Sequence, residues 1–155
     1  MKRIFEGFIR FCSGRSAFAF NESAPGSRPD GRPTFYASEA IASVGLFVTL
    51  SAGKLVKATE NGIAIGQNMS AVETDDINVI PIAADLLSSG GEKSVTADGD
   101  ITALARLVVG DSAGAKVLPT TAGTYYVVGV ALTAAADGGT CRFMPCVPYP
   151  AVVTE

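Results

Sequence analysis

The fold class is decided by residues 45–66, GLFVTLSAGKLVKATENGIAIG. Short apolar runs, rich in β-branched residues, alternate here with turn-forming residues, a pattern typical of antiparallel strands joined by tight connections. Asn61-Gly62 is the strongest hairpin signal, because these residue types readily adopt the positive φ angles of a type I′ turn. The stretch therefore predicts β-strands and turns.

The same pattern continues through residues 37–155, where strand-sized apolar runs are each bounded by Gly, Asp, Asn or Pro. Many short strands divided by turns predict an all-β domain, either a compact β-sandwich or a small β-barrel. Helical turns at 83–87 and 101–107 are a minor alternative that does not change the class. The expected strands are 44–50, 55–58, 63–65, 77–82, 95–97, 107–109, 116–118, 125–132 and 140–147.

An internal echo indicates that the domain is built from two similar β units. Ser51-Ala52-Gly53 recurs as Ser112-Ala113-Gly114, and each copy is followed by a short apolar run. A strand containing Gly66 or Gly129 comes next, and the segments INVIPI and TCRFMPCV then correspond. The offset is about 61 to 63 residues, so two β units could cover each other's apolar faces. Chance similarity between turn-rich segments is the alternative.

The N-terminal region, residues 1–36, differs from this β body. Its first twenty residues hold an apolar stripe whose spacing predicts a short amphipathic helix. Residues 21–34 contain three Pro and two Gly, the composition of a linker. We therefore divide the chain into an N-terminal arm with its linker, 1–36, and a β-rich domain, 37–155.

The arm is basic and aromatic, which predicts contact with a partner surface. Residues 1–33 carry a net charge of +3, and the remaining residues carry −6. A helix this short is marginal alone in water, so its own domain, another subunit or a membrane face would have to cover it. A solubilising tail is the alternative. The candidate contact residues are Phe5, Phe8, Arg10, Phe11, Arg15, Phe18 and Phe20.

Composition argues against an enzyme. The chain contains no histidine, which excludes Ser-His-Asp and Cys-His catalytic pairs and imidazole metal ligands. The carboxylate pairs Asp75-Asp76 and Asp98-Gly99-Asp100 lie in polar turn contexts and lack the spacing of a calcium-binding loop. We therefore expect no catalytic residue, no metal site and no cofactor.

The three cysteines predict neither a disulfide framework nor a zinc site. Cys12, Cys141 and Cys146 are odd in number and show no CxxC spacing, so a reducing compartment fits best. Cys141 and Cys146 are expected on opposite faces of one strand, as buried and unreactive thiols rather than a redox pair. The net charge of −3 gives the molecule no electrostatic reason to bind nucleic acid or an anionic membrane, so we expect neither partner.

The C-terminal half resembles the capsid decoration, or cement, proteins of tailed bacteriophages. The resemblance lies in residues 107–119 (LVVGDSAGAKVLP), 128–132 (VGVAL) and 134–143 (AAADGGTCRF). Residues 45–66 look like the opening hairpin of the same family. The likeness covers about residues 40–148, and its motifs consist of small residues.

This resemblance implies a non-enzymatic protein that binds the outer surface of an assembled icosahedral head and stabilises it. The implied partners are the major capsid protein and further copies of the chain, commonly in a homotrimer. The implied location is the capsid surface of the virion, after synthesis in the cytoplasm of the host bacterium. The N-terminal segment is not part of the likeness, so the arm residues take no role from it.

Two other function classes stay open. The chain could be another virion structural component, such as a head fibre or a minor shell protein. It could also be a host-surface or glycan-binding module. Such modules use exposed aromatic platforms, however, and this chain has no Trp and only four Tyr.

Overall fold

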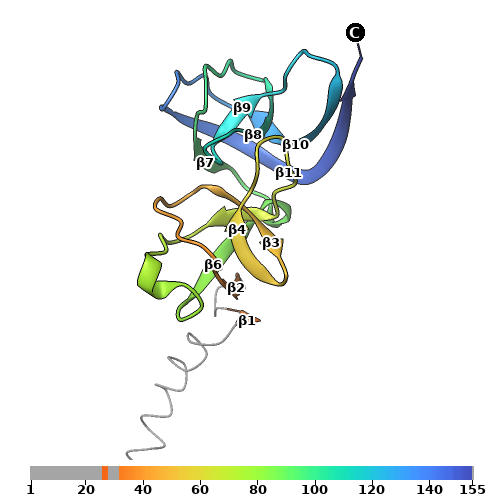
Figure 1. The fold of residues 1–155 in the computed structure, drawn as a ribbon. Coiled ribbons are helices and arrows are strands. Elements are labelled where there is room, and N and C mark those ends of the chain that lie inside the picture. The colour runs from red at the N-terminus through yellow and green to blue at the C-terminus, as the bar shows by residue number, and fades with distance from the viewer. Residues whose placement is uncertain (1–25, 28–31, 155) are drawn as a thin grey trace, which may run out of the picture.

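The computed structural model describes residues 26–27 and 32–154, and within them the chain is almost entirely β-structure. The strands form two antiparallel sheets, one above the other in Figure 1. This confirms the predicted all-β class. The first sheet has the order β1-β2-β6-β5-β3-β4 and consists of β1 (Gly26–Ser27), β2 (Pro33–Tyr36), β3 (Phe47–Ser51), β4 (Lys54–Lys57), β5 (Gly66–Asn68) and β6 (Pro81–Leu86).

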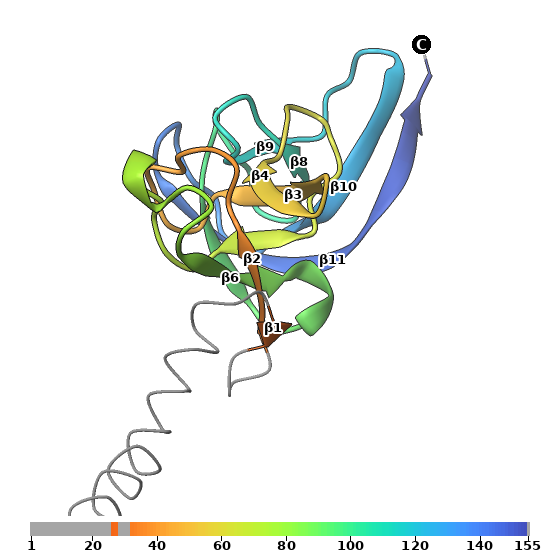
Figure 2. The ribbon, with the colours of Figure 1, turned by 60° about the horizontal axis from the view of Figure 1, so that its bottom comes forward.

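The second sheet contains the longest strands of the described chain. Two of them, β10 and β11, form a curved pair that ends near the C-terminus (Figure 2). Two short 3₁₀ turns, η2 (Thr74–Asp76) and η3 (Leu87–Ser89), flank β6. The second sheet has the order β7-β11-β10-β8-β9 and consists of β7 (Lys93–Thr96), β8 (Arg106–Val109), β9 (Ala115–Val117), β10 (Gly123–Ala131) and β11 (Thr140–Val153).

The two sheets repeat one topology, as the echo in the sequence predicts. If β2 to β6 are matched in chain order with β7 to β11, both sheets have the same strand order, and β1 is an additional edge strand of the first. Isolated bridges repeat as well. Ala37 bridges Leu55 as Ala97 bridges Ala115, and Ile41 bridges Val72 as Ile101 bridges Ala135. We call residues 33–86 the first unit and residues 93–153 the second unit.

Gly66 and Gly129 occupy equivalent places in the two units. Gly66 lies opposite Val48 and Leu86 in the register of its sheet, and Gly129 lies opposite Leu107 and Pro145. A Cβ at Gly66 would lie 2.6 Å from the carbonyl oxygen of Asp85, and one at Gly129 would lie 2.5 Å from that of Met144. Glycine is therefore required at both positions, because the backbone of the last strand of each unit passes too close to leave room for a Cβ.

The register corrects the alignment of the third echoed segment. The sequence predicts a strand at 77–82, but β6 begins only at Pro81. Asn78 adopts a positive φ of 61°, and the carbonyl of Asp76 accepts hydrogen bonds from the N–H groups of both Val79 and Ile80. This turn closes the chain before the strand starts, so Pro81, rather than Ile77, is the counterpart of Thr140.

Three other local expectations are wrong. Residues 63–65 form no strand, because the pairing with β3 and β6 begins only at Gly66. Residues 83–86 belong to β6, and only Leu87–Ser89 makes a helical turn. Residues 101–107 contain a bridge, a turn and the start of β8 rather than a helix. In each case tertiary strand pairing overrides weak local preference.

Residues 33–36, placed with the linker on composition, form β2 inside the first sheet. Thr34, Phe35 and Tyr36 pair with β6, and Thr34 is buried. Pro33 stands at the first position of the strand, where a missing N–H is tolerated. This end of the segment is thus part of the β body.

The hydrophobic core lies mainly between the two units. Its largest cluster joins Phe47, Ala58 and Ala64 of the first unit, and Leu87 of the connection, to ten buried residues of the second unit. The rings of Phe47 and Phe143 meet edge to face, with centroids 5.8 Å apart and planes at 79°. A second cluster around Val48 and Leu55 lies within the first unit. A third, formed by Val108, Tyr125 and Val127, lies under the curved β10–β11 pair.

Candidate interaction surfaces

The junction between the units is made by a cross-strand row of three residues on the first sheet. Phe47, Gln67 and Asp85 lie side by side on β3, β5 and β6, and we call them the first row. Each member contacts the second unit. Phe47 packs on Phe143, the Gln67 side chain donates a hydrogen bond to the carbonyl of Ser94 at 2.9 Å, and Asp85 pairs with Lys93.

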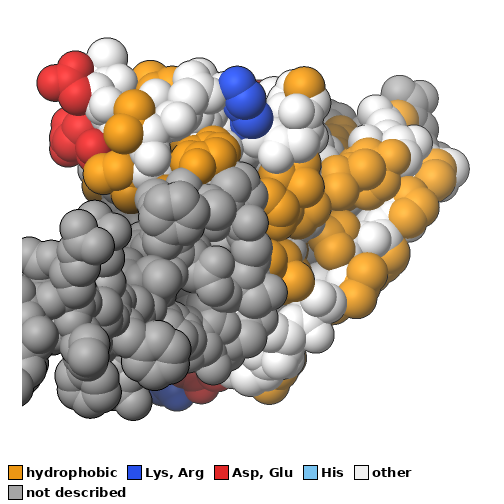
Figure 3. Space-filling model, turned by 90° about the horizontal axis from the view of Figure 1, so that it is seen from below, with side chains coloured by type: hydrophobic (Ala, Val, Ile, Leu, Met, Phe, Trp, Pro, Cys, Tyr) orange, Lys and Arg blue, Asp and Glu red, His pale blue; other side chains and the backbone are white. Residues whose placement is uncertain are grey.

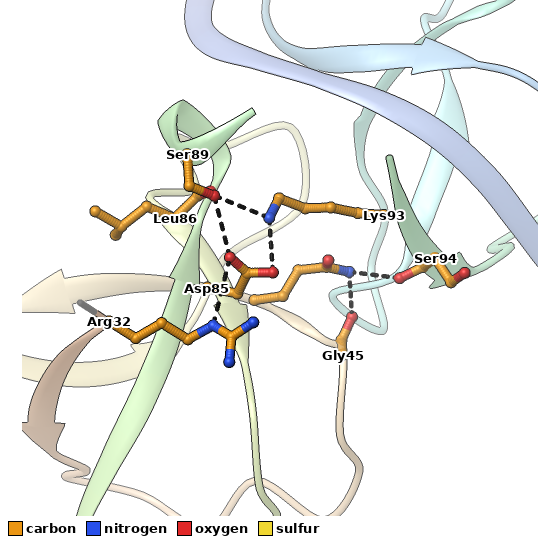
Figure 4. A network of polar contacts seen from close by, with 8 residues as sticks. Arg32, Gly45, Asp85, Leu86, Ser89, Lys93 and Ser94 are labelled. Carbon is orange, nitrogen blue, oxygen red and sulfur yellow. Dashed lines mark hydrogen bonds and ion pairs between the residues drawn. The ribbon is translucent and has the colours of Figure 1, made fainter. Parts of the chain in front are cut away.

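Lys93 is a buried cation held by polar partners from the first unit and the connection (Figure 4). Its ammonium lies 2.6 Å from the carboxylate of Asp85 and donates to the hydroxyl of Ser89 at 3.1 Å. The guanidinium of Arg32 lies 3.9 Å from the same carboxylate. A buried charge is costly unless it is paired, so this network fixes β7 against β6.

A groove of about 390 Å³ opens beside this network. The ion pair between Lys93 and Asp85 forms part of its wall, and its charges neutralise each other there. The groove therefore lies at the junction of the two units. Its lining residues are Arg32, Pro33, Ala84, Asp85, Leu86, Ser89, Gly90, Glu92 and Lys93.

The second sheet carries an equivalent row that is exposed. Arg106, Val130 and Met144 lie side by side on β8, β10 and β11, and we call them the second row. Val130 is 36% exposed and Met144 is 47% exposed. Leu104, which precedes β8, and Leu132, which follows β10, are exposed to 78% and 39%. Hydrophobic side chains also gather on the face seen in Figure 3, on the side where β10 and β11 lie.

The outer edge of β11 is shaped against strand pairing. In the described residues β7 pairs only with Thr140–Phe143, so the remainder of that edge has no strand beside it. This part of β11 contains Pro145, Pro148 and Pro150, and each proline lacks the backbone N–H that pairing with a further strand needs. Exposed apolar side chains here can thus pack face to face but cannot readily add a further strand. These side chains are Val147, Tyr149 and Val152.

The turn carboxylates hold loops together, as their polar contexts predict. Asp98 accepts a hydrogen bond from the N–H of Ser112 at 3.0 Å, and Asp137 accepts one from the N–H of Gly99 at 2.8 Å. Burial raises the pKa of Asp98, but hydrogen bonds from Ser112 and Asp111 outweigh burial and hold that pKa below its usual value. The hydrogen bond with Asp98, together with its charge, raises the pKa of Asp111.

The two described thiols are kept protonated. Cys141 is fully buried in the junction core, its thiol donates to the carbonyl of Thr133, and burial raises its pKa. Cys146 is half-buried against the cluster around Tyr125, and burial raises its pKa also. Both thiols are free, and a raised pKa makes a thiol a poor nucleophile. Among residues 26–27 and 32–154, no group of three or more His, Cys, Asp or Glu could hold a metal ion.

The seven contact residues predicted from the sequence, from Phe5 to Phe20, lie outside the described residues. The exposed second row was missed by sequence reasoning. The match of Gln67 with Val130 and of Asp85 with Met144 follows from the strand register, which differs from the alignment of the repeats in the sequence.

The fold and these surfaces define a class of protein: a domain of two tandem β units with exposed apolar side chains on the second sheet. In the part of the chain that is described, no helix has the length and apolarity to span a lipid bilayer. No protein-family model matches the sequence, and no curated protein sequence matches it.

A solved structure shares the fold. It is the head fibre gp8.5 N base of bacteriophage phi29, with a TM-score of 0.56 and 17% sequence identity. The alignment spans 79% of this chain and 96% of the phi29 chain. At this identity the likeness establishes a common fold.

Proposed function

We propose that this protein is a structural component of a bacteriophage virion, which binds the outer surface of the assembled head and stabilises it. The observation that carries the proposal is the fold shared with a phage head fibre base over nearly all of that base. The motifs in residues 107–143 support it independently, because they resemble those of capsid decoration proteins.

A head fibre is the alternative, and the likeness to the phi29 fibre base supports it equally. The two functions differ in geometry. A decoration protein occupies the repeated positions of the capsid lattice and reinforces joints between capsomers, whereas a fibre projects from the shell. Imaging of intact heads that carry the protein distinguishes a flush layer from a projecting density.

The mechanism of decoration is adhesive and uses no cofactor or chemical step. Many weak contacts that span joints between capsid subunits add up to strong binding when copies are linked in a homo-oligomer such as a trimer. The N-terminal arm, with its aromatic side chains and net positive charge, would lie across the major capsid protein or a neighbouring copy. The chain would be made in the host cytoplasm and end on the virion surface.

Cosedimentation tests this proposal. Purified full-length protein is mixed with empty heads of the phage whose genome carries the sequence, and the bound amount is measured by gel densitometry after pelleting. We expect saturable binding and a higher temperature of head disruption. Failure to bind heads at micromolar concentration would refute the proposal.

A truncated variant tests the arm while keeping the described fold intact. Deletion of residues 1–25 removes the seven predicted contact residues and leaves β1 in place. We expect the truncated protein to bind heads more weakly. Unchanged occupancy would remove the arm from the mechanism but leave attachment of the β body standing.

A further inference from the structure

The repeat makes the two rows comparable position by position. In the first sheet, Phe47 lies one residue before Val48, which pairs with Gly66. In the second sheet, Arg106 lies one residue before Leu107, which pairs with Gly129. The other row members follow from the same register, so Gln67 corresponds to Val130 and Asp85 to Met144. The two rows are therefore the same surface on two copies of one unit.

At two of the three positions the chemistry of the rows is inverted with respect to burial, whereas at the third the apolar Phe47 is buried and the charged Arg106 is exposed. Gln67 is 5% exposed and Asp85 forms a junction ion pair, yet both are polar. Val130 and Met144 are apolar and are exposed to 36% and 47%. Apolar residues at exposed positions, where the other unit has polar residues, indicate a surface that is covered in the working assembly.

Leu104 supplies a second, independent sign. The N–H of Leu104 donates to the carbonyl of Ala131. The N–H of Gly45 makes the equivalent bond in the first unit, to the carbonyl of Asn68, so Leu104 is the counterpart of Gly45. Both have positive φ, 64° for Leu104 and 81° for Gly45. A leucine is strained in this conformation, whereas a glycine is not. The second unit thus places a strained leucine, 78% exposed, beside the second row.

We propose that the second row, together with Leu104 and Leu132, is the contact surface between copies of this chain. Within one chain, the same surface of the first unit is already covered by another copy of the unit, so contact with a further copy continues an existing interface. Interfaces between identical copies are more apolar than the rest of a protein surface, which agrees with the exposed side chains of Val130, Met144 and Leu104. The prolines of β11 favour such face-to-face packing over open-ended strand addition.

This inference rests on the proposed function, because it names the surface that would make the adhesive protein multivalent. Sedimentation equilibrium of the full chain in the absence of heads tests it. The variant V130Q/M144D gives the second row the residues that the first row carries at the same backbone positions. The control V79Q/I80D introduces the same two residue types, Gln and Asp, at two exposed apolar residues outside the row, which are 61% and 47% exposed.

We expect the wild type and the control to be oligomeric in the micromolar range, and V130Q/M144D to be monomeric with an unchanged far-ultraviolet circular dichroism spectrum. Leu104→Gly is a second variant that relieves backbone strain and therefore should fold. We expect it to raise the dissociation constant of the oligomer at least about tenfold.

A monomeric wild type, or a V130Q/M144D variant that associates like the wild type, would overturn the interface. If the wild type is monomeric and V130Q/M144D fails to bind heads, the surface contacts the shell and the proposal of a second copy is wrong. Head binding by a monomeric wild type would leave the proposed function intact. An oligomer with no affinity for heads would refute that function and leave the interface standing.

Discussion

Replacing Phe47 with alanine should destabilise the whole body, because Phe47 is the largest side chain that the first unit contributes to the shared core. Its side chain is fully buried and its ring meets Phe143 edge to face at 5.8 Å. Truncation of a buried phenylalanine costs about 3–5 kcal/mol, which includes the lost aromatic pair. For a chain of this size each kcal/mol lowers the melting temperature by about 2–4 °C. The expected loss is therefore roughly 6–20 °C.

Urea unfolding followed by far-ultraviolet circular dichroism measures the loss in free energy of unfolding at fixed protein concentration, and a thermal melt measures the loss in melting temperature. The control Val44→Ala truncates a 59% exposed side chain three residues earlier, and it should change stability by less than about 0.5 kcal/mol. A loss below about 1 kcal/mol for Phe47→Ala would refute the account of the junction. So would two separate unfolding transitions in the wild type, because the units would then fold independently of their shared core.

Lys93→Met should cost up to about 3 kcal/mol by leaving Asp85 without its closest cation, and the double variant with Asp85→Asn should recover most of this in thermal melts. Gly129→Ala should cost about 1–3 kcal/mol by overpacking against β11, and faster amide exchange in that strand should report it. Asp111→Asn should stabilise the protein at pH 7. The raised pKa of Asp111 means that its stabilising protonated form is lost as pH rises, whereas asparagine keeps a donor toward Asp98. The gain should vanish below about pH 4, and an equal gain at every pH in urea titrations would contradict this reasoning.

The sequence predicted strands well where apolar residues alternated with strong turn chemistry. Residues 107–109, 125–132 and 140–147 are all strand residues or their immediate neighbours in the structure, since these runs are long or bounded by Gly and Asp. Residues 63–65 are apolar and residues 77–80 are mostly apolar, yet they lie outside strands because pairing starts only at Gly66 and Pro81. A short apolar run does not itself determine where hydrogen bonds to a neighbouring strand begin.

The candidate surface could be predicted less well than the fold. The sequence drew attention to the aromatic arm, because its spacing is local and visible. The second row is assembled from β8, β10 and β11, which are distant in the chain, and its members look ordinary in their local contexts. Only the register of the strands brings Arg106, Val130 and Met144 together.

The sequence by itself determined the all-β class and the absence of histidine, and it indicated the doubling of the β unit, because these depend on composition and on short patterns of residues. The tertiary structure alone decided which face of each unit is covered. The two units share a backbone plan, but within the described residues the first row packs against the second unit, whereas Val130 and Met144 of the second row are exposed. That asymmetry arises from how two copies pack, which no local pattern of residues encodes.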